Sequence, residues 1–455
     1  MQLPTDFIQK YQELLQEQAP AFLESLQGDV QKGFRLNPLK QNYQEVQFDL
    51  SKPVAYVPTG YYGEVSGKTI EHQAGYVYSQ DLSAMYVAEV CAPQPGDKVL
   101  DLCAAPGGKT THLAGLLKQS GLLVSNEINR KRASILAENV ERIGAKNVII
   151  LNETPAKLAS QFPEYFDKIV VDAPCSGEGM FRKDPNAINY WTKDYPATCA
   201  LRQKEILQEA LKMLRPGGQL VYSTCTFAPE EDEQIIAWLL KQYPTLEILP
   251  IQKFTGMDDG RPEFADNNPT LTNTLRLMPH HFKGEGHFIA KLQDTRAQSE
   301  TIVNNNKKKR SAKQQLSSEQ YQLWQEFCQN TLVDFPTSIH QLKCYGDHLY
   351  LYQPEWPDLS KLKFMRPGLL LGTFKKKRFE PSYALALALQ PQQVKNVLEV
   401  TSEQWQAYVA GNVVSLDKQV ANGWYLLTCH KKPFSFGKVV YPQVKNFFPK
   451  ALRFQ

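Results

Sequence analysis

The chain has 455 residues, of which 42% are apolar and 22% charged, with a formal net charge of +4. These values exclude a wholly disordered chain and allow several domains of about 100–200 residues each. No run of about 18 apolar residues occurs, which argues against a transmembrane helix, and the opening MQLPTDFIQK lacks the layout of a signal peptide, so we expect a cytoplasmic protein.

The first 75 residues predict a small α+β cap. Apolar residues recur at helical spacing between residues 3 and 28, and Pro20 suits the start of a second helix. Residues 33–38, VQFDL (46–50) and VAYVP (54–58) predict short strands. We therefore expect residues 1–75 to form an N-terminal α+β cap.

Residues 76–292 predict a parallel α/β sheet covered on both faces, because short apolar runs alternate with amphipathic helices there. A helix is expected over 130–143, and another opens at Pro229 with the acids that follow it. The expected strands are residues 98–102, 122–124, 148–151, 169–171 and 220–222.

The C-terminal part is basic. From residue 294 onward the sequence holds 22 Lys and Arg against 12 Asp and Glu, whereas the preceding part holds 29 against 35. This asymmetry suggests a polyanionic partner, although a well-solvated surface explains charge alone about as well. The polar segment 293–318 predicts a linker, and the return of apolar residues predicts folded modules over 319–388 and 389–455.

A glycine-rich turn, DLCAAPGGKT (101–110), follows the first strand of the predicted sheet and opens a helix. Its small residues allow a ligand to approach the backbone closely. It matches neither the GxGxxG of a dinucleotide site nor the GxxxxGK[ST] of a phosphate loop. Glu127, at the end of the second strand, is placed to bind a ribose diol, so turn and acid together predict S-adenosylmethionine. A merely structural turn is the alternative.

Two of the eight cysteines follow strand ends on the same expected rim. Cys175 lies in DAPCSGEG after the fourth strand, and Cys225 lies in STCT after the fifth. A thiolate there can add to C6 of cytosine, which makes C5 a nucleophile toward a methyl sulfonium. Asp172 could stabilise the electron density that reaches N3, and a base must later remove the C5 proton. Structural cysteines, or a disulfide disfavoured in the cytoplasm, are the alternatives.

The motifs DLCAAPGGKT, DAPCSGEGM and STCT, in this order, resemble those of the Sun family of RNA (cytosine-5)-methyltransferases. QDLSAM (80–85) and RLNPLK (35–40) are similar to further motifs of that family, so the resemblance covers roughly residues 33–292. It implies a Rossmann-like methyltransferase that uses S-adenosylmethionine and no metal. It also implies that Cys225 attacks cytosine, that Cys175 assists release, and that Asp172 serves both the catalytic and the cofactor site.

The resemblance also assigns the cofactor pocket. Besides Glu127 and Asp172 it implies contacts from the turn itself, namely Cys103, Ala104, Ala105, Pro106, Gly107, Gly108 and Lys109. A further family acid should fall at Thr154, where this chain departs from the pattern. Either the neighbouring Glu153 substitutes, or the adenine amine loses one acceptor. We expect Lys109 to close the turn rather than act as a base, and Arg132 to be a solvated helix position.

The C-terminal part resembles the RsmF subgroup of bacterial 16S rRNA methyltransferases. FMRPGL (364–369) and GTFKKKRFEPS (372–382) look like that subgroup, and SFGK (435–438) with KNFFPK (445–450) resembles its PUA-like β-barrel. Basic residues interleaved with aromatics suit phosphate contact and base stacking.

The expected function is therefore formation of 5-methylcytosine in the rRNA of the small ribosomal subunit, through a covalent cysteine–C6 intermediate. One alternative is an RNA-binding ribosome assembly factor whose methyltransferase domain is silent. Methylation of tRNA is a second. Methylation of protein is a third, disfavoured because amine and oxygen nucleophiles need no covalent activation by two cysteines.

Overall fold

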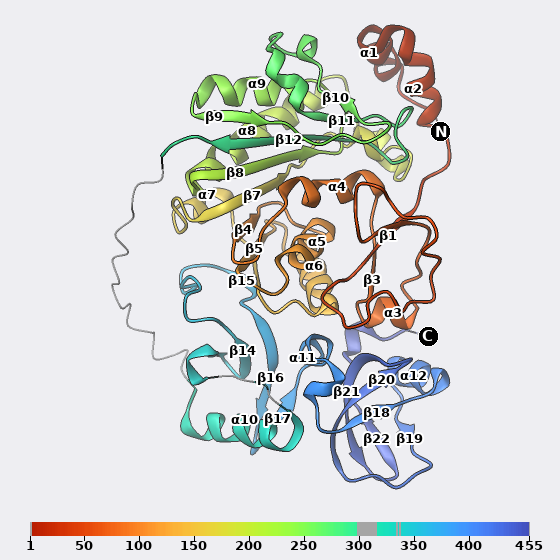
Figure 1. Cartoon of the computed structure of the whole chain (residues 1–455), viewed down its shortest axis with the longest axis vertical. Coiled ribbons are helices and arrows are strands. Elements are labelled where there is room, and N and C mark those ends of the chain that lie inside the picture. The colour runs from red at the N-terminus through yellow and green to blue at the C-terminus, as the bar shows by residue number, and fades with distance from the viewer. Residues whose placement is uncertain (1, 298–315, 334, 336–337, 455) are drawn as a thin grey trace.

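The computed structural model describes residues 2–297, 316–333, 335 and 338–454. Most of the segment 293–318, expected to be a linker, lies outside these residues. A ten-stranded sheet crosses the upper part of the molecule, and sheets of four and five strands lie together at its lower end (Figure 1). Within the described residues, no helix is both long and apolar enough to cross a membrane.

The N-terminal cap consists of helices packed on the main body and a three-stranded antiparallel sheet of order β2-β1-β3. Phe7 and Tyr11 bury one face of the first helix against Phe22 of the second, and proline stands in the first turn of that second helix as expected. The elements are α1 (Thr5–Leu15), η1 (Gln16–Gln18), α2 (Ala19–Ser25), β1 (Gly33–Leu36), β2 (Gly60–Tyr62), α3 (Ile70–Gln73) and β3 (Val77–Ser79).

Two strands predicted in the cap are wrong, because residues 46–50 and 54–58 form turns and loops. The Val57 amide donates to the Val54 carbonyl, and the Gly60 amide donates to the Val57 carbonyl. Val54 and Val57 are buried in the core of the main sheet. The apolar residues of this stretch therefore serve a folded loop, which the alternating pattern did not distinguish from a strand.

The ten-stranded sheet has a parallel centre and antiparallel edges. Its order is β10-β11-β12-β8-β7-β4-β5-β6-β15, and β9 also pairs with β12. The five strands from β8 to β6 run parallel, which confirms the Rossmann-like α/β class. On the two sides of this parallel centre, β12 and the edge strand β15 run antiparallel to β8 and β6, so the sheet is mixed and only its centre is parallel.

The elements of this region alternate along the chain as the sequence predicts. They are α4 (Leu82–Cys91), β4 (Lys98–Asp101), α5 (Gly108–Leu117), β5 (Leu122–Asn126), α6 (Arg130–Ile143), β6 (Val148–Leu151), α7 (Pro155–Ala159), β7 (Phe166–Asp172), η2 (Glu178–Met180), η3 (Pro185–Tyr190), α8 (Tyr195–Met213), β8 (Leu214–Thr224), α9 (Glu233–Gln242), β9 (Leu246–Leu249), β10 (Asp258–Asp259), η4 (Pro262–Phe264), η5 (Pro269–Asn273), β11 (Leu275–Leu277) and β12 (His287–Asp294).

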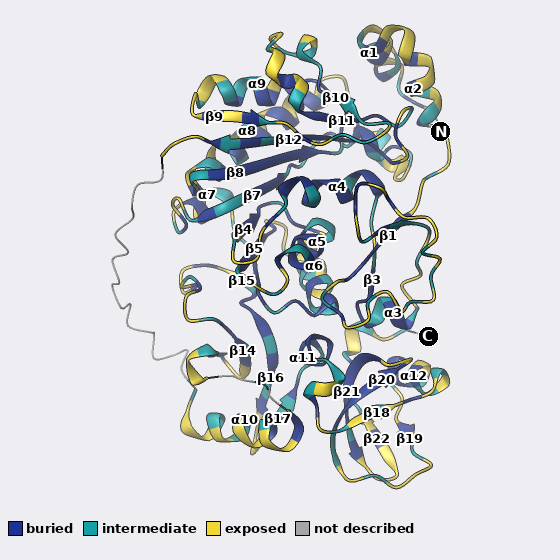
Figure 2. Cartoon of the chain, viewed as in Figure 1, coloured by how far each residue is buried: buried dark blue, intermediate teal, exposed yellow. Residues whose placement is uncertain are grey.

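The core lies on both faces of the sheet. Val99 and Leu100 are neighbours on β4 but belong to different apolar clusters, because successive side chains of a strand point to opposite faces. Helices α4, α5 and α6 cover one face, and α7, α8 and α9 cover the other. The central strands are consequently buried along most of their length (Figure 2).

The C-terminal part contains two small sheets of order β13-β14-β16-β17 and β18-β20-β21-β22-β19. Its elements are α10 (Ser318–Thr331), η7 (Ile339–Gln341), β13 (Leu342–Tyr345), β14 (His348–Leu351), β15 (Phe364–Arg366), β16 (Leu369–Lys375), β17 (Arg378–Pro381), α11 (Tyr383–Ala388), η8 (Pro391–Gln393), β18 (Val397–Glu399), α12 (Ser402–Val409), β19 (Val414–Ser415), β20 (Gly423–Cys429), β21 (Lys432–Val440), β22 (Gln443–Asn446) and η9 (Lys450–Leu452).

One strand of the C-terminal part, β15, completes the main sheet by pairing antiparallel with β6. Arg366 of this strand is buried and donates from Nη2 to the Ala145 carbonyl at 2.7 Å. Lys40 of the cap donates from Nζ to the Leu387 carbonyl at 2.6 Å. Backbone pairing and buried polar contacts therefore fix the C-terminal part to the sheet.

Candidate active site

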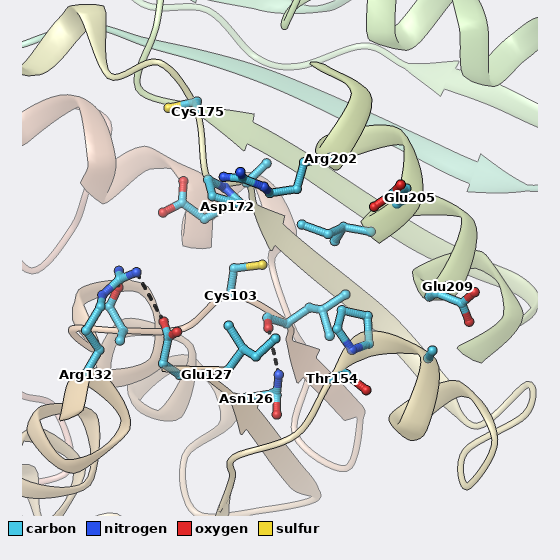
Figure 3. Close-up of a pocket in the computed structure, with 18 of the residues that line it drawn as sticks. Cys103, Asn126, Glu127, Arg132, Thr154, Asp172, Cys175, Arg202, Glu205 and Glu209 are labelled. Atoms are coloured by element: carbon cyan, nitrogen blue, oxygen red, sulfur yellow. Dashed lines mark hydrogen bonds and ion pairs between the residues drawn. The ribbon is translucent and has the colours of Figure 1, made fainter. Parts of the chain in front are cut away.

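The parallel strands of the sheet end beside acidic and thiol side chains. Asp101 ends β4, Glu127 follows β5, Asp172 ends β7 and Cys225 follows β8. Because parallel strands share one carboxyl edge, these residues gather at the same rim. A pocket of about 650 Å³ opens there, lined by residues from the glycine-rich turn, the strand ends and α8 (Figure 3).

The glycine-rich turn forms one wall of the pocket. Of its seven predicted cofactor residues, Cys103 and Ala105 line the cavity, and the other five do not: Ala104, Pro106, Gly107, Gly108 and Lys109. Gly107 precedes α5 with a φ of +115°, and a Cβ there would lie 3.1 Å from Leu136 Cδ1. Glycine at this position therefore lets the turn pack closely on α6.

Glu127 is a buried acid at the cavity wall, held by two groups of the following helix. Its Oε1 accepts from the Asn129 amide at 2.8 Å, and its Oε2 lies 3.4 Å from Arg132 Nη1 (Figure 3). Arg132 also donates from Nη2 to the Ala105 carbonyl at 2.7 Å. Arg132 is an exposed helix position, as expected, with 54% of its side chain accessible, and it additionally links Glu127 to the turn.

Thr154 and Glu153, the two candidates for the adenine end, face different surroundings. Thr154 lines the pocket, and its Oγ1 accepts from the Lys157 amide at 3.3 Å as the cap of α7. Glu153 is not among the lining residues, and its Oε1 accepts from the Lys363 amide at 2.8 Å. The carboxylate of Glu153 is thus engaged by the segment that leads into β15.

The two thiols are in direct contact. The Sγ atoms of Cys175 and Cys225 lie 3.3 Å apart, and both residues line the pocket without forming a disulfide. The hydrogen bond to Cys225, together with burial, raises the pKa of the Cys175 thiol well above its ordinary value. The raised pKa favours a protonated Cys175, while either sulfur can be the donor in this contact.

The Asp172 carboxylate interacts with three other side chains of the site. Its Oδ1 accepts from Ser223 Oγ at 2.8 Å and lies 3.8 Å from His287 Nε2, while its Oδ2 accepts from Lys109 Nζ at 2.7 Å. Burial alone would raise the pKa of Asp172, but Lys109 and His287 outweigh it and hold this pKa well below its usual range. Asp172 is therefore a carboxylate in this arrangement.

Lys109 does more than close the turn. Burial alone would lower its pKa, but the Asp172 carboxylate reverses that effect and raises it, with a further contribution from Cys225. The residue consequently stays an ammonium that faces both the acid and a thiol of the site. The sequence showed the lysine but gave no signal of these partners, which lie on β7 and after β8.

Behind the thiols, two buried acids that the sequence reasoning missed hold the loops that carry them. Glu178, from the loop after Cys175, accepts from the Thr226 hydroxyl at 2.9 Å and the Phe227 amide at 3.2 Å. Glu231, from the loop after Cys225, accepts from the Ser176 amide at 2.9 Å. Each acid thus belongs to one loop and binds the other. The only feature of the sequence that could have indicated these acids is that each follows one of the two cysteines by a few residues.

Four family models match the chain. Residues 88–293 match the model described as 16S rRNA methyltransferase RsmB/F, and residues 3–82 match the N-terminal domain of 16S rRNA methyltransferase RsmF. Residues 326–389 match the first C-terminal domain of RsmF rRNA methyltransferase, and residues 395–454 match the RsmF PUA domain.

Similar curated proteins and solved structures agree with these family matches. The chain is 29% identical to ribosomal RNA small subunit methyltransferase F of Vibrio cholerae, over 99% of this chain and 97% of that protein. It is 30% identical to the protein of the same name from Escherichia coli strain ED1a, over 95% and 92%. A methyltransferase homolog from Pyrococcus horikoshii superposes with a TM-score of 0.56 at 32% identity, over 63% of this chain and 94% of that one.

Proposed function

This chain belongs to the 16S rRNA methyltransferase RsmB/F family, and we propose that it forms 5-methylcytosine in small-subunit rRNA through a thiolate adduct on cytosine C6. Its class is S-adenosylmethionine-dependent RNA methylation. The observation that carries the mechanism is the pair of thiols, whose Sγ atoms lie 3.3 Å apart at the pocket. One covalent bond suffices to activate cytosine, so a second thiol in contact with the first favours a division of tasks.

The electrostatics favour Cys225 as the nucleophile. Cys175 holds its proton, because the hydrogen bond to Cys225 and burial raise its pKa, and a protonated Cys175 can donate to a Cys225 thiolate 3.3 Å away. The Lys109 ammonium also interacts with Cys225, and a nearby cation stabilises a thiolate. In the proposed step the Cys225 sulfur bonds to C6, and the C5=C6 electron pair is displaced toward C5 and N3.

Formation of that bond changes Cys175 in turn. A Cys225 sulfur bonded to carbon is uncharged and a weaker hydrogen-bond acceptor than a thiolate, so the hydrogen bond that raises the pKa of Cys175 is weakened. Cys175 can then lose its proton to solvent and, after methyl transfer, take the proton from C5. The returning electron pair reforms C5=C6 and expels the Cys225 thiolate, which restores the starting protonation of both thiols.

Two features of the pocket and one residue behind its lining fit S-adenosylmethionine. Glu127 is an oriented acceptor for a ribose diol, and Ile128, 63% exposed, offers an apolar face to adenine. Behind the pocket lining, Asp101 Oδ1 is a buried acceptor with no hydrogen-bond partner among the described residues, which suits an amino group. When bound, the cofactor supplies an electrophilic methyl group on its sulfonium, and the reaction as proposed needs no metal.

The C-terminal part supports recognition of rRNA. The turn between β16 and β17 exposes four consecutive basic residues, Lys375, Lys376, Lys377 and Arg378. Exposed lysines and arginines supply the phosphate contacts that dominate affinity for RNA. We infer that this part holds the small-subunit rRNA, and that the protein works in the cytoplasm, where its substrate is assembled.

Bisulfite sequencing of rRNA from cells with and without the gene tests this function. We expect one or more cytosines of 16S rRNA to resist conversion only when the gene is present. A gene copy carrying Cys225→Ala is the matched control, which should make the protein but not the protection. An unchanged 16S rRNA pattern would support the silent assembly factor, and protected cytosines in tRNA alone would support the tRNA alternative.

Glu127→Ala is expected to weaken S-adenosylmethionine binding by about 1–3 kcal/mol, because an oriented acceptor for the ribose is lost. Isothermal calorimetry measures this effect, and NAD should not bind to either protein. Glu153→Ala is the matched control and should leave the affinity unchanged, since its carboxylate binds the Lys363 amide. Equal losses in the two variants would instead make Glu153 a cofactor ligand.

A further inference from the structure

His287, the first residue of β12, is a buried histidine whose tautomer is fixed by its neighbours. Its Nδ1 lies 2.7 Å from the Gly286 carbonyl and 3.2 Å from Ser83 Oγ. The carbonyl can only accept, and the Ser83 hydroxyl gives its proton to Asp81 Oδ1. Nδ1 therefore carries a hydrogen, which leaves Nε2 as the ring atom that can gain or lose one.

Nε2 is buried without a hydrogen-bond partner among the described residues, and it lies 3.8 Å from Asp172 Oδ1. A bare nitrogen lone pair facing a carboxylate would be repelled, whereas a protonated Nε2 would be attracted. The ring therefore pairs favourably with Asp172 only when Nε2 also holds a proton. Hydrogen bonds between catalytic groups are often this long before the substrate is bound, and they shorten in the reacting complex.

The proposed reaction leaves one proton unexplained. When a thiolate adds to C6, cytosine N3 becomes basic and must be protonated, yet Asp172 is held as a carboxylate by Lys109 and His287. The acid that faces the substrate thus has no proton of its own to give. A second group that can release one must lie behind it.

We propose that His287 supplies, through Asp172, the proton that cytosine N3 takes up when Cys225 attacks C6; this inference rests on the proposed function. The Cys225–C6 bond forms and the displaced electron pair reaches N3, while His287 Nε2 passes its proton to the Asp172 carboxylate and Asp172 passes that proton to N3. On release of the product the proton returns along the same path. His287 is a positioning residue in this scheme, because it acts through Asp172.

Lys109 is the competing source, since its Nζ donates to the other Asp172 oxygen at 2.7 Å. Its ammonium is made less acidic by Asp172, so it retains its proton more firmly than an ordinary lysine. An imidazole ordinarily changes charge between about pH 5 and 8 and is suited to exchange one. Asp81 before α4 binds the Ser83 hydroxyl that faces His287, and Glu285, two residues before His287, is paired with Arg182 at 2.9 Å. Cys225 follows Thr224 of β8, which pairs with Phe288 of β12.

The test compares wild type with His287→Gln in single-turnover methylation of 16S rRNA across pH. Wild type must first methylate this RNA; if it does not, the proposed function fails, whatever His287 does. The rate of the wild type should then fall as rising pH removes the imidazolium. His287→Gln should be slower by about 100-fold near neutral pH and should lose that fall, because the amide cannot supply a proton.

S-adenosylmethionine affinity should be the same in both proteins, which separates proton supply from damage to the pocket. The matched control is His281→Gln, a half-buried histidine paired with Asp258 at 2.8 Å outside the pocket, and it should keep both rate and pH profile. A His287→Gln rate close to wild type, or a slow rate with an unchanged pH profile, would overturn the proposal. If this variant does not fold, His287→Asn replaces it, and a wild-type rate that does not fall with rising pH overturns the proposal without any variant.

Discussion

Replacing Cys225 by alanine is expected to abolish methyl transfer, whereas replacing Cys175 by alanine is expected to leave the enzyme bound covalently to its RNA. The first change removes the sulfur that adds to C6, so neither product nor adduct can form. The second leaves attack and methyl transfer possible but removes the group that takes the C5 proton. Because the adduct cannot break down without losing that proton, it should accumulate.

A denaturing gel after incubation with 16S rRNA and S-adenosylmethionine measures the adduct as a slow-migrating band. The band should appear with Cys175→Ala, and it should be absent from Cys225→Ala and from the double variant. Cys328→Ala, a half-buried cysteine of α10 away from the pocket, is the control and should behave as wild type. A band with Cys225→Ala and none with Cys175→Ala would reverse the two roles. Full activity in both variants would exclude covalent catalysis.

Glu178→Ala is expected to lower the free energy of unfolding by about 3–5 kcal/mol and to stop methyl transfer. The side chain is fully buried and accepts from the hydroxyls of Tyr11 and Thr226, the indole of Trp191 at 2.9 Å and the Phe227 amide. Its removal leaves four buried donors unpaired and frees the loop of Cys175 from the loop of Cys225. The distance between the two thiols would then no longer be fixed.

Glu230→Ala is the matched control for this prediction, because both acids contact the same lysine. Lys10 Nζ lies 3.9 Å from Glu178 Oε1 and 3.0 Å from Glu230 Oε2, but the Glu230 side chain is 33% exposed. Loss of such a partly exposed ion pair should cost less than about 1 kcal/mol. Urea unfolding followed by circular dichroism measures both variants. Similar losses in the two would show that the buried donors around Glu178 find other partners.

The parallel centre of the sheet could be predicted because its signals are local. The apolar run 148–151 coincides with β6, and the helix predicted over 130–143 coincides with α6, which Asn129 caps. The positions of Cys175 and Cys225 after strand ends also follow from local sequence, although their roles stay predictions. Each of these features depends on residues within one element or its cap.

The remaining features depend on contacts between distant segments, which the sequence does not display. Arg132 was expected to be solvated and Lys109 to close a turn, yet each meets its partner on another element of the rim. The sequence around His287 did not mark it as a site residue, because its proposed role depends on the proximity of Asp172, which lies on another strand of the sheet. The strand β15 was missed for the same reason, because its partner β6 lies far upstream in the sequence: Phe364 pairs with Leu151.

Because β15 pairs with β6, the main sheet can finish folding only late in the synthesis of the chain. Roughly 200 residues separate the two strands, so the edge of β6 stays open until the C-terminal part has been translated. An open strand edge is a template for wrong pairing with other chains. A nascent or prematurely terminated chain would therefore expose this edge to chaperones and proteases, and only a chain that already carries its C-terminal part could close its catalytic sheet.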